Sequence, residues 1–169
     1  MASQDLKDMV RRYCEEVVST GDLNRVAAFI SPGYVEVYED TRYPLGIEGA
    51  EQHILGVRGT YPDLTVQVLQ QVAEGSLVVS QVRMRGTQAG ERLGIAPTGK
   101  PIVVTAVNID RVVDGRIVEH GGAANLLEPL LRIGAIRVGG PSDVQWRLPL
   151  RRAPAVGEAR VGASPANIR

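Results

Sequence analysis

The chain contains two histidines, and each lies in a segment whose residue pattern places it beside apolar side chains. His120 ends the alternating run of "GRIVEHGGAANLL", which predicts a β-strand with Val118, His120 and Gly122 on one face. The unperturbed pKa of imidazole is near 6.5, so an accessible His120 could act as a general acid or base at neutral pH. A core histidine with satisfied hydrogen bonds is the alternative, and the pattern favours a pocket residue.

His53 lies in "GIEGAEQHILGVRGTYPDL", whose periodicity predicts a helix that ends before Pro62. The apolar stripe of that helix includes Ala50, His53, Ile54, Val57 and Tyr61. A lone histidine on such a stripe is more often a core residue with one hydrogen bond. The alternative is that His53 faces a pocket shared with His120 and supplies a proton-transfer group from the opposite wall.

Asn108, in "TAVNID", is a polar residue within a strongly apolar strand pattern. A buried amide without a hydrogen-bond partner costs about 1–3 kcal/mol. We therefore expect Asn108 either to bind a carbonyl group of a substrate or to anchor His120.

Glu36 lies in the alternating segment "GYVEVYED", where it shares one face with Tyr38 and Asp40. That face is either the solvent face, with Val35 and Val37 inward, or the wall of a pocket. Alternation slightly favours the solvent face. In an apolar pocket, burial would raise the pKa of Glu36 and make it a plausible general base.

The elements that must position these residues follow an ααβαββββ order, with helices first and a run of strands afterwards. This order predicts an α+β domain in which three N-terminal helices pack into a strongly curved, mostly antiparallel sheet. A short closing helix near "NLLEPLLRIGAI" is also compatible with the pattern. The predicted helices cover 3–20, 22–30 and 46–61, and the predicted strands cover 34–40, 64–75, 76–90, 100–115 and 116–127.

Composition separates a domain over residues 1–136 from a Gly-, Pro- and Arg-rich extension over 137–169. The extension is either a poorly ordered tail or a segment docked through "DVQWRLPL", which holds the only tryptophan. Because an exposed tryptophan is costly, we expect this segment to dock on the domain or on a dimer partner.

The formal net charge is zero and the cations are scattered, which argues against nucleic acid and membrane surfaces as partners. Without a signal-peptide or transmembrane pattern, a cytoplasmic location is the default. The single Cys14 has no metal-ligand spacing around it, and we expect no metal site.

Several segments, in order, resemble the SnoaL-like polyketide cyclase (ester cyclase) family of the nuclear transport factor 2-like superfamily. The resemblance covers roughly Val10 to Ile136 and implies a cone-shaped α+β fold with an apolar pocket, usually a homodimer, and no cofactor. It also implies an enzyme of bacterial secondary metabolism that closes a ring in a polyketide ester by intramolecular aldol condensation. The segments that carry it are "YCEEVVSTGDLNRV", "SPGYVEV", "YPDLTVQV", "RGTQAGERLGIAPTGKPI" and "NIDRVVDGRIVEH".

The resemblance also implies that the residues after His120 differ from those of the family. Family cyclases carry the acid/base aspartate two residues after this histidine, where the present chain has Gly122, and often an aromatic residue at the position of Gly121. The standard aldol mechanism therefore does not carry over. By the same comparison Asn108 and Glu36 match polar pocket positions. The residues expected to bind substrate are Tyr13, Tyr38, Val57, Tyr61, Met84, Gln88 and Gly122, with Gln88 at the mouth of the pocket.

Two functions remain from the sequence. One is a cofactor-free enzyme that holds a polyketide-like substrate and assists one proton transfer in a reaction other than the aldol condensation. Ring closure is the expected outcome, and the candidate reactions are cycloaddition, ether or spiroketal formation, dehydration and isomerisation. Under this hypothesis His120, His53, Glu36 and Asn108 are the catalytic candidates. The other is a non-catalytic ligand-binding or interaction module that kept the cone and lost its acid/base residues. Related folds also serve as dehydratases, isomerases and hydroxylase-like proteins, so the fold alone does not fix the reaction.

Overall fold

The computed structural model describes residues 2–137 and Gly139 of the 169-residue chain. The expected docking segment "DVQWRLPL" lies outside these residues. The helical segments are α1 (Ser3–Arg12), η1 (Tyr13–Val18), η2 (Leu23–Arg25), α2 (Val26–Phe29), α3 (Gly46–Thr60) and α4 (Leu127–Ile133). The strands are β1 (Ile30–Tyr38), β2 (Thr41–Pro44), β3 (Thr65–Glu74), β4 (Leu77–Thr87), β5 (Pro101–Val113) and β6 (Arg116–Asn125).

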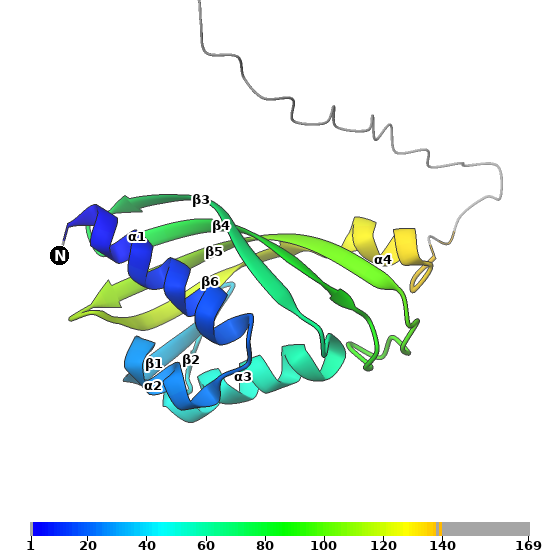
Figure 1. Ribbon diagram of the computed structural model, residues 1–169, viewed down its shortest axis with the longest axis horizontal. Helices are drawn as coiled ribbons and strands as arrows, with labels where there is room; N and C mark the ends of the chain where they lie inside the picture. The colour runs from blue at the N-terminus through cyan, green and yellow to red at the C-terminus, as the bar shows by residue number, and fades with distance from the viewer. Residues whose placement is uncertain (1, 138, 140–169) are drawn as a thin grey trace, which may run out of the picture. The chain divides into compact units, whose positions relative to one another are not determined.

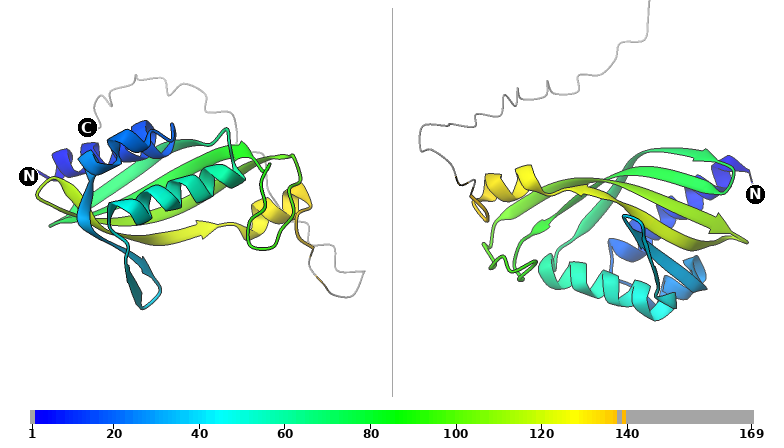
Figure 2. Two further views of the ribbon diagram at one scale, coloured as in Figure 1. Left: turned by 90° about the horizontal axis from the view of Figure 1, so that it is seen from below. Right: turned by 180° about the vertical axis from the view of Figure 1, so that it is seen from behind.

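The described residues form an α+β fold built on one six-stranded sheet in the order β2-β1-β6-β5-β4-β3. Only the β1–β6 pair is parallel among these strands, and the other neighbours are antiparallel. The sheet curves over α1 and α3, which lie on its concave face (Figure 1). The two views of Figure 2 show the same arrangement from below and from behind. The predicted α+β fold class with a strongly curved, mostly antiparallel sheet is confirmed.

The structure differs from the predicted elements in the segment before α3. "SPG" was expected to end a helix, but it lies inside β1, which begins at Ile30. The chain then reverses at Glu39, which has a positive φ of 52°, and returns as β2. The sequence analysis missed β2 because all four of its residues are exposed, so no apolar alternation marks it. The closing helix α4 does form, and Pro129 occupies its first turn, where a missing backbone N–H costs little.

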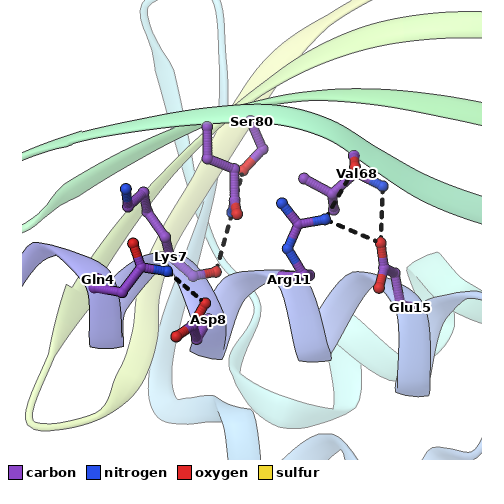
Figure 3. Close-up of polar contacts among 8 residues, drawn as sticks. Gln4, Lys7, Asp8, Arg11, Glu15, Val68 and Ser80 are labelled. Atoms are coloured by element: carbon purple, nitrogen blue, oxygen red, sulfur yellow. Dashed lines mark hydrogen bonds and ion pairs between the residues drawn. The ribbon is translucent and has the colours of Figure 1, made fainter. Parts of the chain in front are cut away.

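The first helix continues from α1 into the π-helical turn η1, in which the Ser19 N–H donates to the Cys14 carbonyl at 3.0 Å. This helix holds the free edge of the sheet at β3. Figure 3 shows Arg11 donating to the Val68 carbonyl at 3.0 Å and Glu15 accepting the Val68 N–H at 3.0 Å. Because β3 is the last strand, these backbone groups have no strand partner, and the helix side chains satisfy them.

The core lies between the helices and the concave face of the sheet. Alternate residues of β4 and β5 point into it, as the two-residue period predicts. None of the helices within the described residues is long and apolar enough to cross a membrane. The buried apolar residues include Val10, Val17, Ala50, Ile54, Val66, Val68, Val78, Val82, Ile102, Val104, Ala106 and Ile117.

Candidate active site

A cavity of about 350 Å³ lies between the concave face of the sheet and the helices α3 and η1. Most of its wall is apolar, with a few polar groups, which is the usual composition of a small-molecule site. The structure brings to this wall all four predicted catalytic residues and six of the seven predicted substrate-binding residues. These ten are His120, His53, Glu36, Asn108, Tyr13, Tyr38, Val57, Tyr61, Met84 and Gly122.

The central polar contact of the cavity joins two neighbouring strands. Asp110 on β5 faces His120 on β6 in the strand register, and His120 Nδ1 lies 2.7 Å from Asp110 Oδ1. The Asp110 side chain is 2% exposed and that of His120 is 21% exposed. A carboxylate can only accept, so Nδ1 donates the proton and Nε2 is the ring nitrogen left for a ligand.

A bulge in β6 brings His120 to this position. The register between β5 and β6 shifts between Arg111 and Val112, so Val118 is an extra residue on β6. Ile117 therefore lines the cavity together with His120 and Gly122, whereas Val118 does not belong to its wall. The predicted face of Val118, His120 and Gly122 is correct for the last two residues and wrong for Val118, because a bulge interrupts the alternation.

A second polar group surrounds Glu36 on β1. Tyr34 Oη donates to Glu36 Oε2 at 2.6 Å, and His53 Nδ1 on α3 lies 3.4 Å from Glu36 Oε1. Glu36 thus faces the cavity, and the interpretation of its face as the solvent face is wrong. The reason is that Tyr34, Glu36 and Tyr38 share the inward side of β1, with Tyr38 exposed at the rim.

The environment of Glu36 also overturns the expected direction of its pKa. Burial raises the pKa of this carboxyl, as anticipated, but hydrogen bonds from His53 and Tyr34 and the charge of His120 outweigh burial and lower it to about 2. Glu36 is therefore a stable carboxylate at neutral pH. It is suited to stabilising cations and unsuited to serving as a base with a raised pKa.

His120 has the opposite shift. Burial disfavours its charged form, but the charge and hydrogen bond of Asp110, together with the charge of Glu36, raise the pKa of His120 above its ordinary value of 6.5. The imidazolium form is thus stabilised by two carboxylates on adjacent strands. A group of this kind can release a proton as a general acid and take one as a general base near neutral pH.

His53 is not the core histidine that the helical stripe favoured. Its side chain is 47% exposed, and its ring lies edge-on to that of His120 with 6.4 Å between centroids. It therefore stands at the cavity wall opposite β6, as the alternative prediction had it. Its Nδ1 contacts Glu36, and the other part of the ring is open to solvent.

Asn108 lines the cavity two residues before Asp110, opposite Gly122 in the strand register. Within residues 2–137 its side chain forms no hydrogen bond with His120, whose anchor is Asp110 instead. Of the two expected roles, contact with a ligand is the one that this geometry leaves open.

Gly121 and Gly122 are required by close backbone contacts. A Cβ atom on Gly122 would lie 2.3 Å from the Val107 carbonyl oxygen, and its φ of +155° is one that other residues rarely adopt. A Cβ atom on Gly121 would lie 2.9 Å from the Val37 carbonyl oxygen. A side chain at position 122 is therefore excluded on this backbone.

Gln88 is the exception among the predicted binding residues. It is 1% exposed, its Nε2 donates to the Ala96 carbonyl, and its Oε1 accepts the backbone N–H and hydroxyl of Thr98. The prediction that it binds substrate at the cavity mouth is not supported by this placement, because its amide is used to hold the loop between β4 and β5.

Asp110 and Tyr34 belong to the polar part of the site, and neither was expected from the sequence. A signal for Asp110 existed, because it lies two residues after Asn108 and alternation places both on one face. Tyr34 is likewise two residues before Glu36. The missing information was which face of each strand points inward.

Comparison with known proteins agrees with this architecture. The SnoaL-like polyketide cyclase family matches residues 8–132. IdmH from Streptomyces antibioticus, assigned as a polyketide cyclase, is 31% identical, with a TM-score of 0.65 over 76% of this chain and 98% of its own. The chain belongs to the SnoaL-like polyketide cyclase family. This membership indicates an enzyme with a polyketide cyclase-type role.

Two further solved structures are also similar to this chain. AclR from Streptomyces galilaeus, assigned as a hydroxylase, is 26% identical, with a TM-score of 0.70 over 81% of this chain and 89% of its own. TsrD from Streptomyces laurentii is 26% identical, with a TM-score of 0.65 over 79% and 95%. No curated protein matches the chain significantly. Because one fold supports several activities, the reaction of this protein has to be inferred from the chemistry of its own cavity.

The Asp110–His120 pair predicts a pH dependence of stability. Because the folded pKa of His120 lies above the unfolded value, the stabilisation is complete below about pH 6.5 and is lost as pH rises through the folded pKa. Asp110→Asn removes the carboxylate charge. We expect it to lower the free energy of unfolding by about 1 kcal/mol more at pH 6 than at pH 9, measured by urea denaturation. Asp40→Asn, an exposed turn residue, is the control, and an equal loss at both pH values would contradict the assignment.

The glycine contacts predict that position 122 tolerates neither an aspartate nor an alanine. Gly122→Asp and Gly122→Ala should each destabilise the fold by at least about 2 kcal/mol, because the Cβ atom meets backbone oxygen and the φ is strained. Thermal unfolding measures the loss. Gly56→Ala on α3, where an added Cβ meets no atom within 4 Å, should be neutral or stabilising. Unchanged stability of Gly122→Ala would show that the backbone contact is not limiting.

Proposed function

We propose that this protein is a cytoplasmic, cofactor-free cyclase of bacterial polyketide or other secondary metabolism. It folds a flexible, largely apolar substrate inside the cavity and assists ring closure by one proton transfer at His120. The observation that carries the proposal is the buried Asp110–His120 contact at the wall of an apolar cavity of about 350 Å³. Without that contact, the cavity would support only ligand binding.

The proton transfer uses the free nitrogen of His120. In the neutral ring, Nδ1–H donates to Asp110 and Nε2 accepts a proton from the substrate. The resulting imidazolium is stabilised by Asp110 and by the charge of Glu36. It then returns the proton to the oxygen or carbon atom that becomes basic as the ring closes. Tyr34 and His53 keep Glu36 hydrogen-bonded and ionised during this cycle.

Confinement of the substrate in the cavity supplies the remaining rate acceleration. The apolar wall excludes water and limits the conformers of a flexible chain, and holding reacting atoms in place can remove several kcal/mol of a barrier. Asn108 offers an amide to a carbonyl or hydroxyl group beside His120. The positions of these groups favour a substrate with one reactive polar end among them.

The reaction is a ring closure other than the standard aldol condensation. The residue that would carry the second acid/base group is Gly122, and its backbone admits no side chain. A single group that takes and returns one proton fits ring closure by addition of a hydroxyl group, which forms an ether or a spiroketal. The same proton transfer would also serve a dehydration or an isomerisation, which close no ring. A cycloaddition would use the cavity for confinement and His120 for polarisation.

The second candidate is a non-catalytic ligand-binding module on the same fold. The absence of an acid/base side chain at Gly121 and Gly122 favours it. The Asp110–His120 contact argues against it, because it leaves an oriented imidazole with one free nitrogen at the cavity wall, which ligand binding alone does not require.

We further propose a homodimer formed through the outer face of the sheet. Val103, Val107, Ile109 and Val113 alternate along β5 on the convex side, and each is between 43% and 52% exposed. Such a row of exposed apolar residues favours burial against a second copy. The double variant Val107→Lys with Ile109→Lys should give the mass of a monomer by light scattering, whereas the wild type gives twice that mass. Leu55→Lys on α3 is the control, and a monomeric wild type would contradict the proposal.

The catalytic proposal predicts base catalysis in the cavity that depends on His120. Base-promoted ring opening of 5-nitrobenzisoxazole, a small apolar probe, measures one proton abstraction. We expect His120→Gln to lower kcat/KM by about 100-fold or more and Asp110→Asn to lower it substantially. His53→Gln should cost less, about tenfold, because it acts through Glu36. The rate should rise with pH through the raised pKa of His120.

Glu119→Gln is the matched control for this experiment. Glu119 precedes His120 on β6 but pairs with Arg42 and Arg111 outside the cavity, so its variant should retain the wild-type rate within about twofold. A wild-type rate no higher than that of His120→Gln would contradict base catalysis and favour the binding module.

A further inference from the structure

Arg92 is a cation at the cavity wall that the proposed proton transfer does not use. It lies in the loop between β4 and β5 and lines the cavity beside Tyr61, at the end of α3. Burial raises the pKa of the Tyr61 hydroxyl and the charge of Arg92 opposes that rise, which reflects their proximity. Arg92 is half-buried.

The loop between β4 and β5 holds the backbone of Arg92 through hydrogen bonds. Its N–H donates to the Ile95 carbonyl at 3.2 Å, and the Ile95 N–H donates back at 2.9 Å. The Thr60 hydroxyl at the end of α3 donates to the Glu91 carbonyl at 3.3 Å. Yet no ion pair or side-chain hydrogen bond within residues 2–137 involves the Arg92 guanidinium. A positioned arginine without a carboxylate partner is ready to bind an anion.

Arg92 and His120 mark different ends of one cavity. His53, which stands edge-on to His120, is eight residues before Tyr61 on the same helix, a rise of about 12 Å. The strand register gives a similar separation. Asp110, at the His120 end, faces Val78 on β4. Gly86, which lies beside Tyr61, is eight residues further along the same strand. A chain of about ten atoms would span this separation.

Charge orients any ligand that carries an anionic group. Asp110 and Glu36 place two carboxylates at the His120 end, and they would repel an anion there. The wall between the two ends is apolar and includes Val82, Val104 and Ile54. Arg85 also borders the cavity, but it is exposed and lies between the inward-facing Met84 and Gly86, so alternation assigns its side chain to the outer face.

We propose that Arg92 binds an oxyanion of the substrate, a carboxylate or a phosphate monoester, and thereby directs the other end of an apolar chain to His120. The ligand is therefore an amphiphile with a free acid group at one end, and an esterified or neutral analogue is a poorer ligand. Recognition of the acid rests only on the cavity, whereas the identity of the reacting end rests on the proposed function.

The test compares binding of dodecanoate, dodecyl phosphate, methyl dodecanoate and dodecanol by calorimetry at constant ionic strength. The wild type should bind one of the two anions about tenfold more tightly than methyl dodecanoate and dodecanol. Arg92→Met should remove this preference and leave the affinity for dodecanol within about twofold. Whether dodecanoate or dodecyl phosphate binds more tightly identifies the oxyanion. The control is Arg83→Met, the same change on the outer side of β4 between two cavity residues, and it should keep the preference.

Two results would overturn the proposal. Equal affinity of the wild type for the anions and for dodecanol would show that Arg92 selects no acid, even if the cavity binds apolar chains and His120 catalyses. An acid preference that Arg92→Met retains would assign recognition to another residue. Because proton abstraction from 5-nitrobenzisoxazole requires no acid group, failure of this proposal and failure of the catalytic one are read from separate experiments.

Discussion

The contact between Asp110 and His120 is the constraint on which the rest of the site depends. A carboxylate that is 2% exposed is costly to bury unless a cation or strong donor satisfies it, and the imidazole Nδ1 at 2.7 Å does so. Because the two residues face each other on adjacent strands, the sheet register fixes the ring. That fixed ring leaves one nitrogen available at an apolar cavity wall.

The remaining polar groups are arranged around this contact. Glu36 adds a second negative charge and is itself held ionised by Tyr34 and His53, so the cavity stabilises a cation at His120. Gly122 lets β6 approach the backbone of β5 so closely that no side chain fits. The carboxylate that contacts His120 therefore comes from Asp110 on the neighbouring strand, and position 122 of β6 has no room for a side chain.

Much of the fold was predictable because its elements carry strong periodic patterns. The helical stripe from Ala50 to Tyr61 and the four long strands of the sheet follow the sequence closely. The short exposed strand β2 and the start of β1 were not predictable, because their pairing is set by partners distant in sequence. The bulge at Val118 was hidden for the same reason.

The site was predictable in its membership and less so in its chemistry. Alternation indicated His120 and the family resemblance indicated Glu36, but the sequence could not say that three neighbours would lower the pKa of Glu36 and outweigh its burial. Gln88 shows the opposite error, since a polar residue expected to face a ligand satisfies loop backbone groups instead. In both cases the outcome depends on contacts between segments far apart in the chain.

Asp110 holds His120 with Nδ1 protonated and Nε2 free to accept a proton. Nitrogen-15 NMR of the two histidines, recorded at a pH above the pKa of His120, measures the tautomer directly. We expect His120 to carry its proton on Nδ1 and none on Nε2 in the wild type. In Asp110→Asn we expect a shift toward the usual mixture of tautomers. A neutral His120 protonated at Nε2 in the wild type would contradict it.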